Sequence, residues 1–118
     1  MIDLKTFENL AGTPVGSFAP KPTTLTPGQT EAAAELWASD DGRTSIGVWE
    51  CTPGTFTADR SAGAEYCHII SGSASVQNQD GSAMRSIGPG DLLVLPLGWK
   101  GQWTIHEHIK KLYVINAA

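Results

Sequence analysis

The 118-residue sequence is poor in cysteine, in long apolar runs and in positive charge, each of which would point directly to a class of protein. It contains two cysteines, Cys51 and Cys67, which are too few for a disulfide framework and are predicted to be buried free thiols. No apolar run approaches the roughly 20 residues that a membrane span needs. The first residues, MIDLKTFENL, lack the basic and then apolar order of a signal peptide. We therefore expect a cytoplasmic protein that does not engage a membrane.

Positive charge is also scarce. Eight Lys and Arg residues stand against twelve Asp and Glu residues, and the net charge is −4. The basic residues are scattered apart from Lys110-Lys111, which we predict to mark a solvated strand start. Nucleic-acid binding requires a clustered positive surface, so this class is excluded. Anionic partners are disfavoured in general, although a single Arg in a pocket can hold a carboxylate.

Helix-forming patterns are confined to one short segment. Residues 1–34 contain Pro14, Pro20, Pro22 and Pro27 and are predicted to form an irregular arm that precedes a single domain at residues 35–118. The stretch Thr30–Trp37 has good helix propensity, but its second half fits a strand equally well. With no strong amphipathic helix after residue 38, a parallel βαβ fold is excluded.

The rest of the chain has the pattern of an all-β protein. In Thr44–Cys51, Ile46, Val48 and Glu50 alternate with Trp49 and Cys51, which predicts a strand with two distinct faces. A hairpin turn is expected at residues 40–42 and further turns at 71–72, 79–81 and 88–91. Further strands are expected at Ala64–Ser71, Ser73–Gln79, Ser82–Ile87, Leu92–Leu95, Gln102–His106 and Lys110–Asn116. Short strands separated by Gly, Pro and Asp turns indicate a sandwich or barrel.

Two glycine-framed segments carry a family resemblance. The segments PGTFTADRSAGAEYCHIISG (residues 53–72) and GDLLVLPLGWKG (residues 90–101) resemble the two motifs of the cupin superfamily. The flanking GVWECTPGTF and KLYVI look like the branch that contains (S)-ureidoglycine aminohydrolase-like and ethanolamine-utilisation cupins. The resemblance covers about residues 44–116. It implies a single-domain, double-stranded β-helix, a jelly-roll-like barrel.

In metal-binding members of the superfamily, three His and one Glu hold a divalent ion. The resemblance places Glu65 at the carboxylate position and Gly101 at the second-motif histidine position. Residues 58–63 contain no histidine in any register. One carboxylate does not make a metal site, because several donors must converge. We therefore expect no metal and no cofactor, and the metal-dependent activity of the branch is not carried over to this chain.

The residues expected to carry chemistry lie around Glu65. Strand alternation places Glu65, Cys67 and Ile69 on the barrel interior and His68 on the outside. A buried carboxylate must be paired or protonated, and Arg60 is the expected partner. If Glu65 is instead isolated, its raised pKa suits a general acid or base. The alternative is that the pair merely ties a loop to a strand.

The remaining candidates are aromatic, thiol and imidazole side chains. Trp99 and Trp103 flank Gly101, and they either form the floor of a ligand pocket or pack in the core. Cys67 is placed at the site, but no base is positioned to make it a nucleophile. His106 and His108 have a spacing that can bind a metal at a surface, but without a third donor we expect solvated imidazoles.

Three functions remain open from the sequence. The first is a metal-free cupin that binds a small organic ligand, such as a ureide, amino acid or carboxylate, through Glu65, Arg60, Trp99, Trp103 and Cys67. The second is a non-catalytic accessory cupin whose barrel is filled by side chains. The third is a metal-dependent enzyme similar to ureidoglycine aminohydrolase. The resemblance implies a homodimer, and the arm is the segment expected to wrap the partner.

Overall fold

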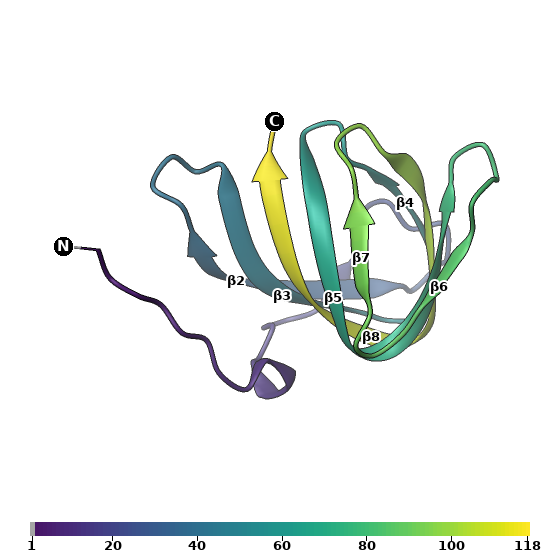
Figure 1. Ribbon diagram of the computed structural model, residues 1–118. Coiled ribbons are helices and arrows are strands. Elements are labelled where there is room, and N and C mark those ends of the chain that lie inside the picture. The colour runs from purple at the N-terminus through teal and green to yellow at the C-terminus, as the bar shows by residue number, and fades with distance from the viewer. Residues whose placement is uncertain (1) are drawn as a thin grey trace.

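The computed structural model describes residues 2–118 and shows an all-β protein, as the sequence predicts (Figure 1). Within residues 2–118 the one helical element is the short 3-10 helix η1 (Leu10–Gly12). The strands are β1 (Ala19–Pro20), β2 (Thr30–Ala38), β3 (Thr44–Cys51), β4 (Gly54–Asp59), β5 (Gly63–Asn78), β6 (Arg85–Ile87), β7 (Leu92–Leu95) and β8 (Lys100–Ala117).

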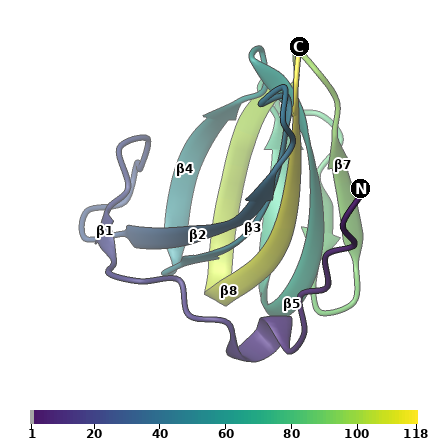
Figure 2. The same ribbon diagram turned by 90° about the vertical axis from the view of Figure 1, so that its left-hand side faces the viewer.

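Two long strands, β5 and β8, organise the sheet. The order β1-β2-β3-β8-β5-β6 describes the main path, while β4 pairs with β8 and β7 pairs with β5. Both long strands bend sharply, so that their two halves stand on opposite sides of an open barrel (Figures 1 and 2). On one side β2, β3, β8, β5 and β7 are neighbours, and on the other β4, β8, β5 and β6 are. All strand pairings within residues 2–118 are antiparallel, as expected for the jelly-roll-like barrel that the resemblance implies.

The bends correct two boundaries drawn from the sequence. Residues Ser71-Gly72 do not end a strand: they lie inside β5, where the register with β8 shifts between Ile69 and Ala74. Gly72 has φ +83°, and a Cβ there would lie 2.2 Å from the carbonyl oxygen of His108. This β-bulge therefore bends β5, which continues as one strand and pairs with β8 on both sides of the bend. Likewise the two strands predicted at 102–106 and 110–116 are one strand, β8.

The segment at residues 30–38 is a strand throughout, so the helix alternative is wrong. It pairs with β3 from Glu31 to Ala38, with one irregularity at Glu35–Trp37. Ala32 is buried there, and packing against β3 outweighs the high helix propensity of alanine, because tertiary contacts override intrinsic propensity. β2 begins at Thr30 and thus crosses the boundary expected between arm and barrel at residue 35.

Two further departures concern strand extents. Residues 54–59, for which the sequence analysis gave no strand, form β4, which pairs with β8 along its length. The strand predicted at 82–87 is confined to β6, Arg85–Ile87.

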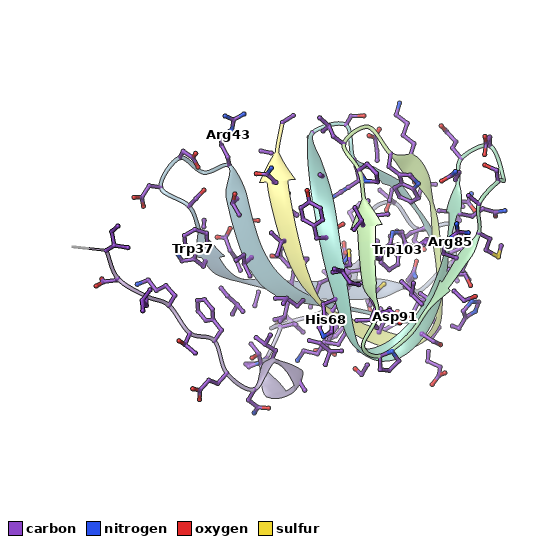
Figure 3. All side chains as sticks on the ribbon, viewed as in Figure 1. Trp37, Arg43, His68, Arg85, Asp91 and Trp103 are labelled. Carbon is purple, nitrogen blue, oxygen red and sulfur yellow. The ribbon has the colours of Figure 1, made fainter. Side chains whose placement is uncertain are left out.

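The main core fills the barrel interior, and a smaller cluster lies on its outer surface. Trp49, Phe56 and Trp103 belong to the main core together with the aliphatic residues of β5 and β8, and Figure 3 shows Trp103 inside the barrel. On the outside, Val48 and Ala32 pack against Val15 of the arm. The alternation predicted for β3 is confirmed, because Trp49 and Cys51 face the main core and Val48 faces the outer cluster. Among residues 2–118, no helix has the length and apolar character of a membrane span.

Candidate functional site

A cavity of about 350 Å³ opens at one end of the barrel. Its walls come from β2, β3, β4, β5 and β8, from the segment that precedes β2 and from Arg60, which follows β4. Of the residues expected to bind a ligand, Glu65, Arg60 and Trp103 line this cavity. Trp49, Phe56 and Trp103 of the main core also line the cavity, so the aromatic core forms part of its wall.

Glu65 is paired on both carboxylate oxygens. It lies on the inward side of β5 opposite Ile115 of β8 and Leu95 of β7, and only 7% of its surface is exposed. Its Oε1 lies 3.3 Å from Nη1 of Arg60, so the ion pair expected from the sequence is present. Its Oε2 lies 3.0 Å from Nζ of Lys111. The carboxylate is therefore buried as an anion between two cations.

Lys111 is a cavity residue that the sequence analysis missed. It was predicted to be solvated, but it is 5% exposed and points into the barrel. Its Nζ lies 4.3 Å from the ring centroid of Trp49 and 4.6 Å from that of Trp103, so the ammonium is held between two indoles as well as beside Glu65. The alternation in β8 contained the signal, because Lys111, Tyr113 and Ile115 share the inward face.

The protonation states follow from this packing. Burial by itself lowers the pKa of Lys111, but the contacts with Cys67 and Glu65 outweigh it, and the pKa is raised above its usual value. Burial raises the pKa of Cys67 to about 11. At neutral pH the ammonium is therefore charged and the thiol is protonated. Cys67 has no exposed surface and does not line the cavity, so it is not available as a nucleophile.

A second ion pair lines the cavity. Lys21 lies 2.8 Å from Oε1 of Glu31, and the same oxygen accepts a hydrogen bond of 2.8 Å from Nε1 of Trp49. Nζ of Lys21 also lies 4.3 Å from the ring centroid of Phe56. Phe56 stacks on Trp103 with centroids 6.0 Å apart. Lys21 and Glu31 were not among the sequence candidates, because both fall within the segment predicted to be an irregular arm.

Trp99 lies away from this cavity. It lines a separate hollow near Val76, Leu93 and Pro96, and its Nε1 donates to Oδ1 of Asn78 at 2.9 Å. Its ring covers Gly101: a Cβ built there would lie 2.4 Å from the indole and 2.1 Å from the carbonyl oxygen of Gln77. The place of the superfamily's second-motif histidine is therefore sterically closed to any side chain.

The residues around Glu65 do not fit a divalent metal. Within residues 2–118, no three His, Cys, Asp or Glu side chains converge on one point. The histidines lie elsewhere: His68 is exposed, His106 is 2.7 Å from the Ser75 hydroxyl, and His108 is 2.8 Å from Oε1 of Glu50. A metal beside Glu65 would also meet the positive charges of Arg60 and Lys111.

Comparison with protein families identifies the chain. The family model described as EutQ-like cupin domain matches residues 38–113. The chain is a member of the EutQ-like cupin family. The superfamily and branch suggested by the two glycine-framed segments are thereby confirmed. A search of curated proteins gave no significant match.

Solved structures show the same fold. The EutQ protein of Clostridium difficile is 24% identical, with a TM-score of 0.68 over 80% of this chain and 74% of that one. A putative ethanolamine utilization protein of Salmonella typhimurium is 19% identical, with a TM-score of 0.65 over 75% of this cupin and 71% of its own chain. A protein of unknown function from Rhizobium leguminosarum is 20% identical and matches over 99% and 100% of the two chains, with a TM-score of 0.72.

Proposed function

We propose that this cupin binds a small organic anion in the barrel cavity without a metal. Suitable ligands are a carboxylate, or a ureide or amino acid that presents one. The observation that carries the proposal is the placement of Arg60 on the cavity wall, where 26% of its side chain is exposed. Nη1 of Arg60 binds Glu65 and Nε binds the carbonyl oxygen of Asp59, and within residues 2–118 Nη2 has no hydrogen-bond partner. This free edge of the guanidinium can hold a carboxylate.

The charge balance of the cavity supports an anionic ligand. The inner wall has three cations, Lys21, Arg60 and Lys111, and two carboxylates, Glu31 and Glu65. The remaining acid, Asp59, stands at the rim with 57% of its side chain exposed and is held by the backbone and hydroxyl of Ser61. The interior therefore has one positive charge in excess, which one ligand carboxylate neutralises.

The aromatic walls disfavour an amine ligand. Ammonium groups bind protein sites through the faces of aromatic rings. Here the rings of Trp49, Phe56 and Trp103 already pack against the ammonium groups of Lys21 and Lys111. The name of the Salmonella relative refers to ethanolamine. We therefore expect the ethanolamine cation to bind this cavity more weakly than a carboxylate of equal size.

A thermal-shift and calorimetry screen tests this function. Small carboxylates, ureido acids, amino acids, neutral ureas and ethanolamine are each added at about 10 mM, where a ligand with a Kd near 0.1 mM stabilises the native state by roughly 2.7 kcal/mol. We expect a rise in Tm with carboxylates that is lost in Arg60→Gln and retained in Lys100→Gln, a control in which a more exposed cation is removed. No shift with any compound, or an equal shift in Arg60→Gln, would contradict the proposal.

The metalloenzyme alternative is tested separately. We expect elemental analysis to find no stoichiometric metal and Mn²⁺, Fe²⁺, Ni²⁺ and Zn²⁺ to leave Tm unchanged, because two cations already neutralise Glu65. The accessory-protein alternative predicts no ligand-induced shift in Tm at all.

The two cysteines bear on the location of the protein. Cys51 and Cys67 are buried free thiols, which fits a reducing compartment, and we propose the cytoplasm.

A further inference from the structure

One edge of β4 is covered over only part of its length. β4 pairs with β8 on one side (Figure 2), and its other side receives residues 23–25, called the cover segment below. The N–H of Leu25 donates to the carbonyl oxygen of Thr55 at 2.8 Å. The N–H of Thr57 donates to the carbonyl oxygen of Thr23 at 3.1 Å. The cover segment therefore protects the edge of β4 as far as the N–H of Thr57.

The cover segment ends there because the residues before it turn away from β4. Pro22 has no N–H with which to extend the pairing. Lys21 donates its N–H to the carbonyl oxygen of Gln29 at 3.1 Å, and its ammonium pairs with Glu31. These bonds hold the chain toward β2. Within residues 2–118, no segment therefore pairs with the outer edge of β4 at Asp59.

Two backbone groups on this edge have no hydrogen-bond partner. In a strand, the N–H and C=O of one residue point to one side, and those of the next residue point to the other. The N–H of Thr57 faces the cover segment, so the carbonyl oxygen of Thr57 and the N–H of Asp59 face the same edge. Within residues 2–118 neither group takes part in a hydrogen bond. Thr57 and Asp59 both line the barrel cavity, so a ligand in the cavity has access to them.

Arg60 stands directly beyond this edge. It follows Asp59, the last residue of β4, and its Nε donates to the carbonyl oxygen of Asp59 at 3.2 Å. The guanidinium therefore lies against the end of the strand. Its Nη1 is bound to Glu65, and within the described residues its Nη2 has no partner. A ligand that pairs with the outer edge of β4 thus meets an anion-binding group one residue later.

We propose that the ligand is the carboxyl terminus of a peptide, which adds to β4 as a short parallel strand. The proposal rests on the function proposed above, because the terminal carboxylate is the anion that Arg60 holds. In parallel pairing, one residue of the added strand donates its N–H to one residue of the partner strand and accepts from the residue two positions further on. Here the penultimate peptide residue donates to Thr57 and accepts from Asp59. The last residue then carries its carboxylate past Asp59 toward Arg60.

The earlier residues of such a peptide have a place in a second hollow. This hollow has a volume of about 350 Å³ and shares Thr57, Ala58 and Asp59 with the barrel cavity. The cover segment blocks a longer strand along β4, so the peptide turns into the hollow, where Gln79 and Gln102 present amide groups. Amide groups pair with the peptide backbone whatever its sequence. We therefore expect recognition of the main chain and the terminal carboxylate, with little dependence on the peptide's side chains.

Calorimetry with synthetic peptides tests this mode of binding. Acetyl-tetra-alanine with a free carboxylate should bind at least about tenfold more tightly than either acetate or the same peptide with a terminal amide. N-methylation of its penultimate residue removes the N–H that donates to Thr57 and should weaken binding at least about tenfold. N-methylation of its last residue, whose N–H points away from β4, is the matched control and should have little effect.

The outcomes separate this proposal from the function on which it rests. If acetate binds and the peptide binds no more tightly, the peptide assignment is overturned while the carboxylate site remains. If neither compound binds, both proposals are overturned. Equal effects of the two N-methyl groups would show that the peptide does not pair with β4, and they overturn the peptide assignment as well.

A proline substitution tests the same contact from the protein's side. Asp59→Pro removes the backbone N–H, and an edge strand tolerates proline where that group faces away from the sheet. Asp59→Ala is the comparison, because both variants lose the side chain that binds Ser61. The peptide should bind Asp59→Pro at least about tenfold more weakly than Asp59→Ala, while acetate binds the two variants alike. Equal peptide affinities overturn the proposal, and if Asp59→Pro does not fold, the N-methylated peptides decide it.

Discussion

The ammonium of Lys111 lies 3.0 Å from Oε2 of Glu65, between the indole faces of Trp49 and Trp103. In metal-binding cupins this carboxylate position serves a divalent ion. Here a lysine from the neighbouring strand β8 supplies the positive charge, and Arg60 supplies another on the opposite oxygen. The positive charge that accompanies Glu65 is therefore part of the polypeptide.

Removing Lys111 should destabilise the protein strongly. In Lys111→Met the buried carboxylate of Glu65 keeps only Arg60, and breaking a buried ion pair in this way costs about 3–5 kcal/mol. Urea unfolding followed by tryptophan fluorescence measures the change. The double variant Lys111→Met/Glu65→Leu should recover most of the loss, and Lys100→Met, an exposed control, should change stability by less than about 1 kcal/mol. A double variant no more stable than the single one contradicts this account.

Glu31 should contribute a pH-dependent part of the stability. Burial raises its pKa, but hydrogen bonds from Lys21 and Trp49 and the charges of Lys21 and Lys111 outweigh it, so the folded-state pKa lies below 4.5. A depressed carboxyl pKa stabilises the native state above pH 4.5, and this contribution is lost as the pH falls through the folded-state pKa. The stability difference between the native chain and Glu31→Gln should therefore be largest near pH 7 and shrink below pH 4.5. The exposed Glu8→Gln serves as control, and a difference that does not change with pH would refute the prediction.

The two thiols should resist modification in the native state. Burial raises the pKa of both Cys51 and Cys67 to about 11, and neither has exposed surface. Alkylation requires an accessible thiolate. We expect iodoacetamide at pH 8 to label neither residue until urea unfolds the chain, as judged by intact-mass analysis. Rapid labelling of the folded protein would show that the interior opens readily.

Gly72→Ala should destabilise the fold more than a substitution at another glycine of the same conformation. Gly72 has φ +83° and Gly81 has φ +86°, so alanine is disfavoured at both by about 1–2 kcal/mol. At Gly72 the new Cβ would also meet the backbone of His108, whereas at Gly81 nothing lies within 4 Å. Chemical denaturation of the two variants isolates the contribution of the close approach. Equal losses of stability in the two variants would mean that β5 accommodates the added Cβ at residue 72 at no further cost.

Local patterns predicted the chain's architecture because its turns and alternation are local properties. The glycines and the alternation of β3 and β5 predicted an all-β barrel with Glu65 and Cys67 inside and His68 outside, and the Arg60–Glu65 contact followed from the need to pair a buried carboxylate. The absence of histidine from residues 58–63 is likewise evident from the sequence itself.

The tertiary structure decided which charges are buried and which strands are continuous. Lys111 and Lys110 look alike in the sequence, yet one lies against Glu65 and two indoles while the other holds the arm on the outer surface. Ser71-Gly72 resembles a hairpin turn in the sequence. In the structure β5 continues through these residues with a bend, because it pairs with β8 on both sides of them. The burial of each lysine and the continuity of each strand depend on contacts between strands that are distant in sequence. A local sequence pattern does not contain the identity of these neighbours.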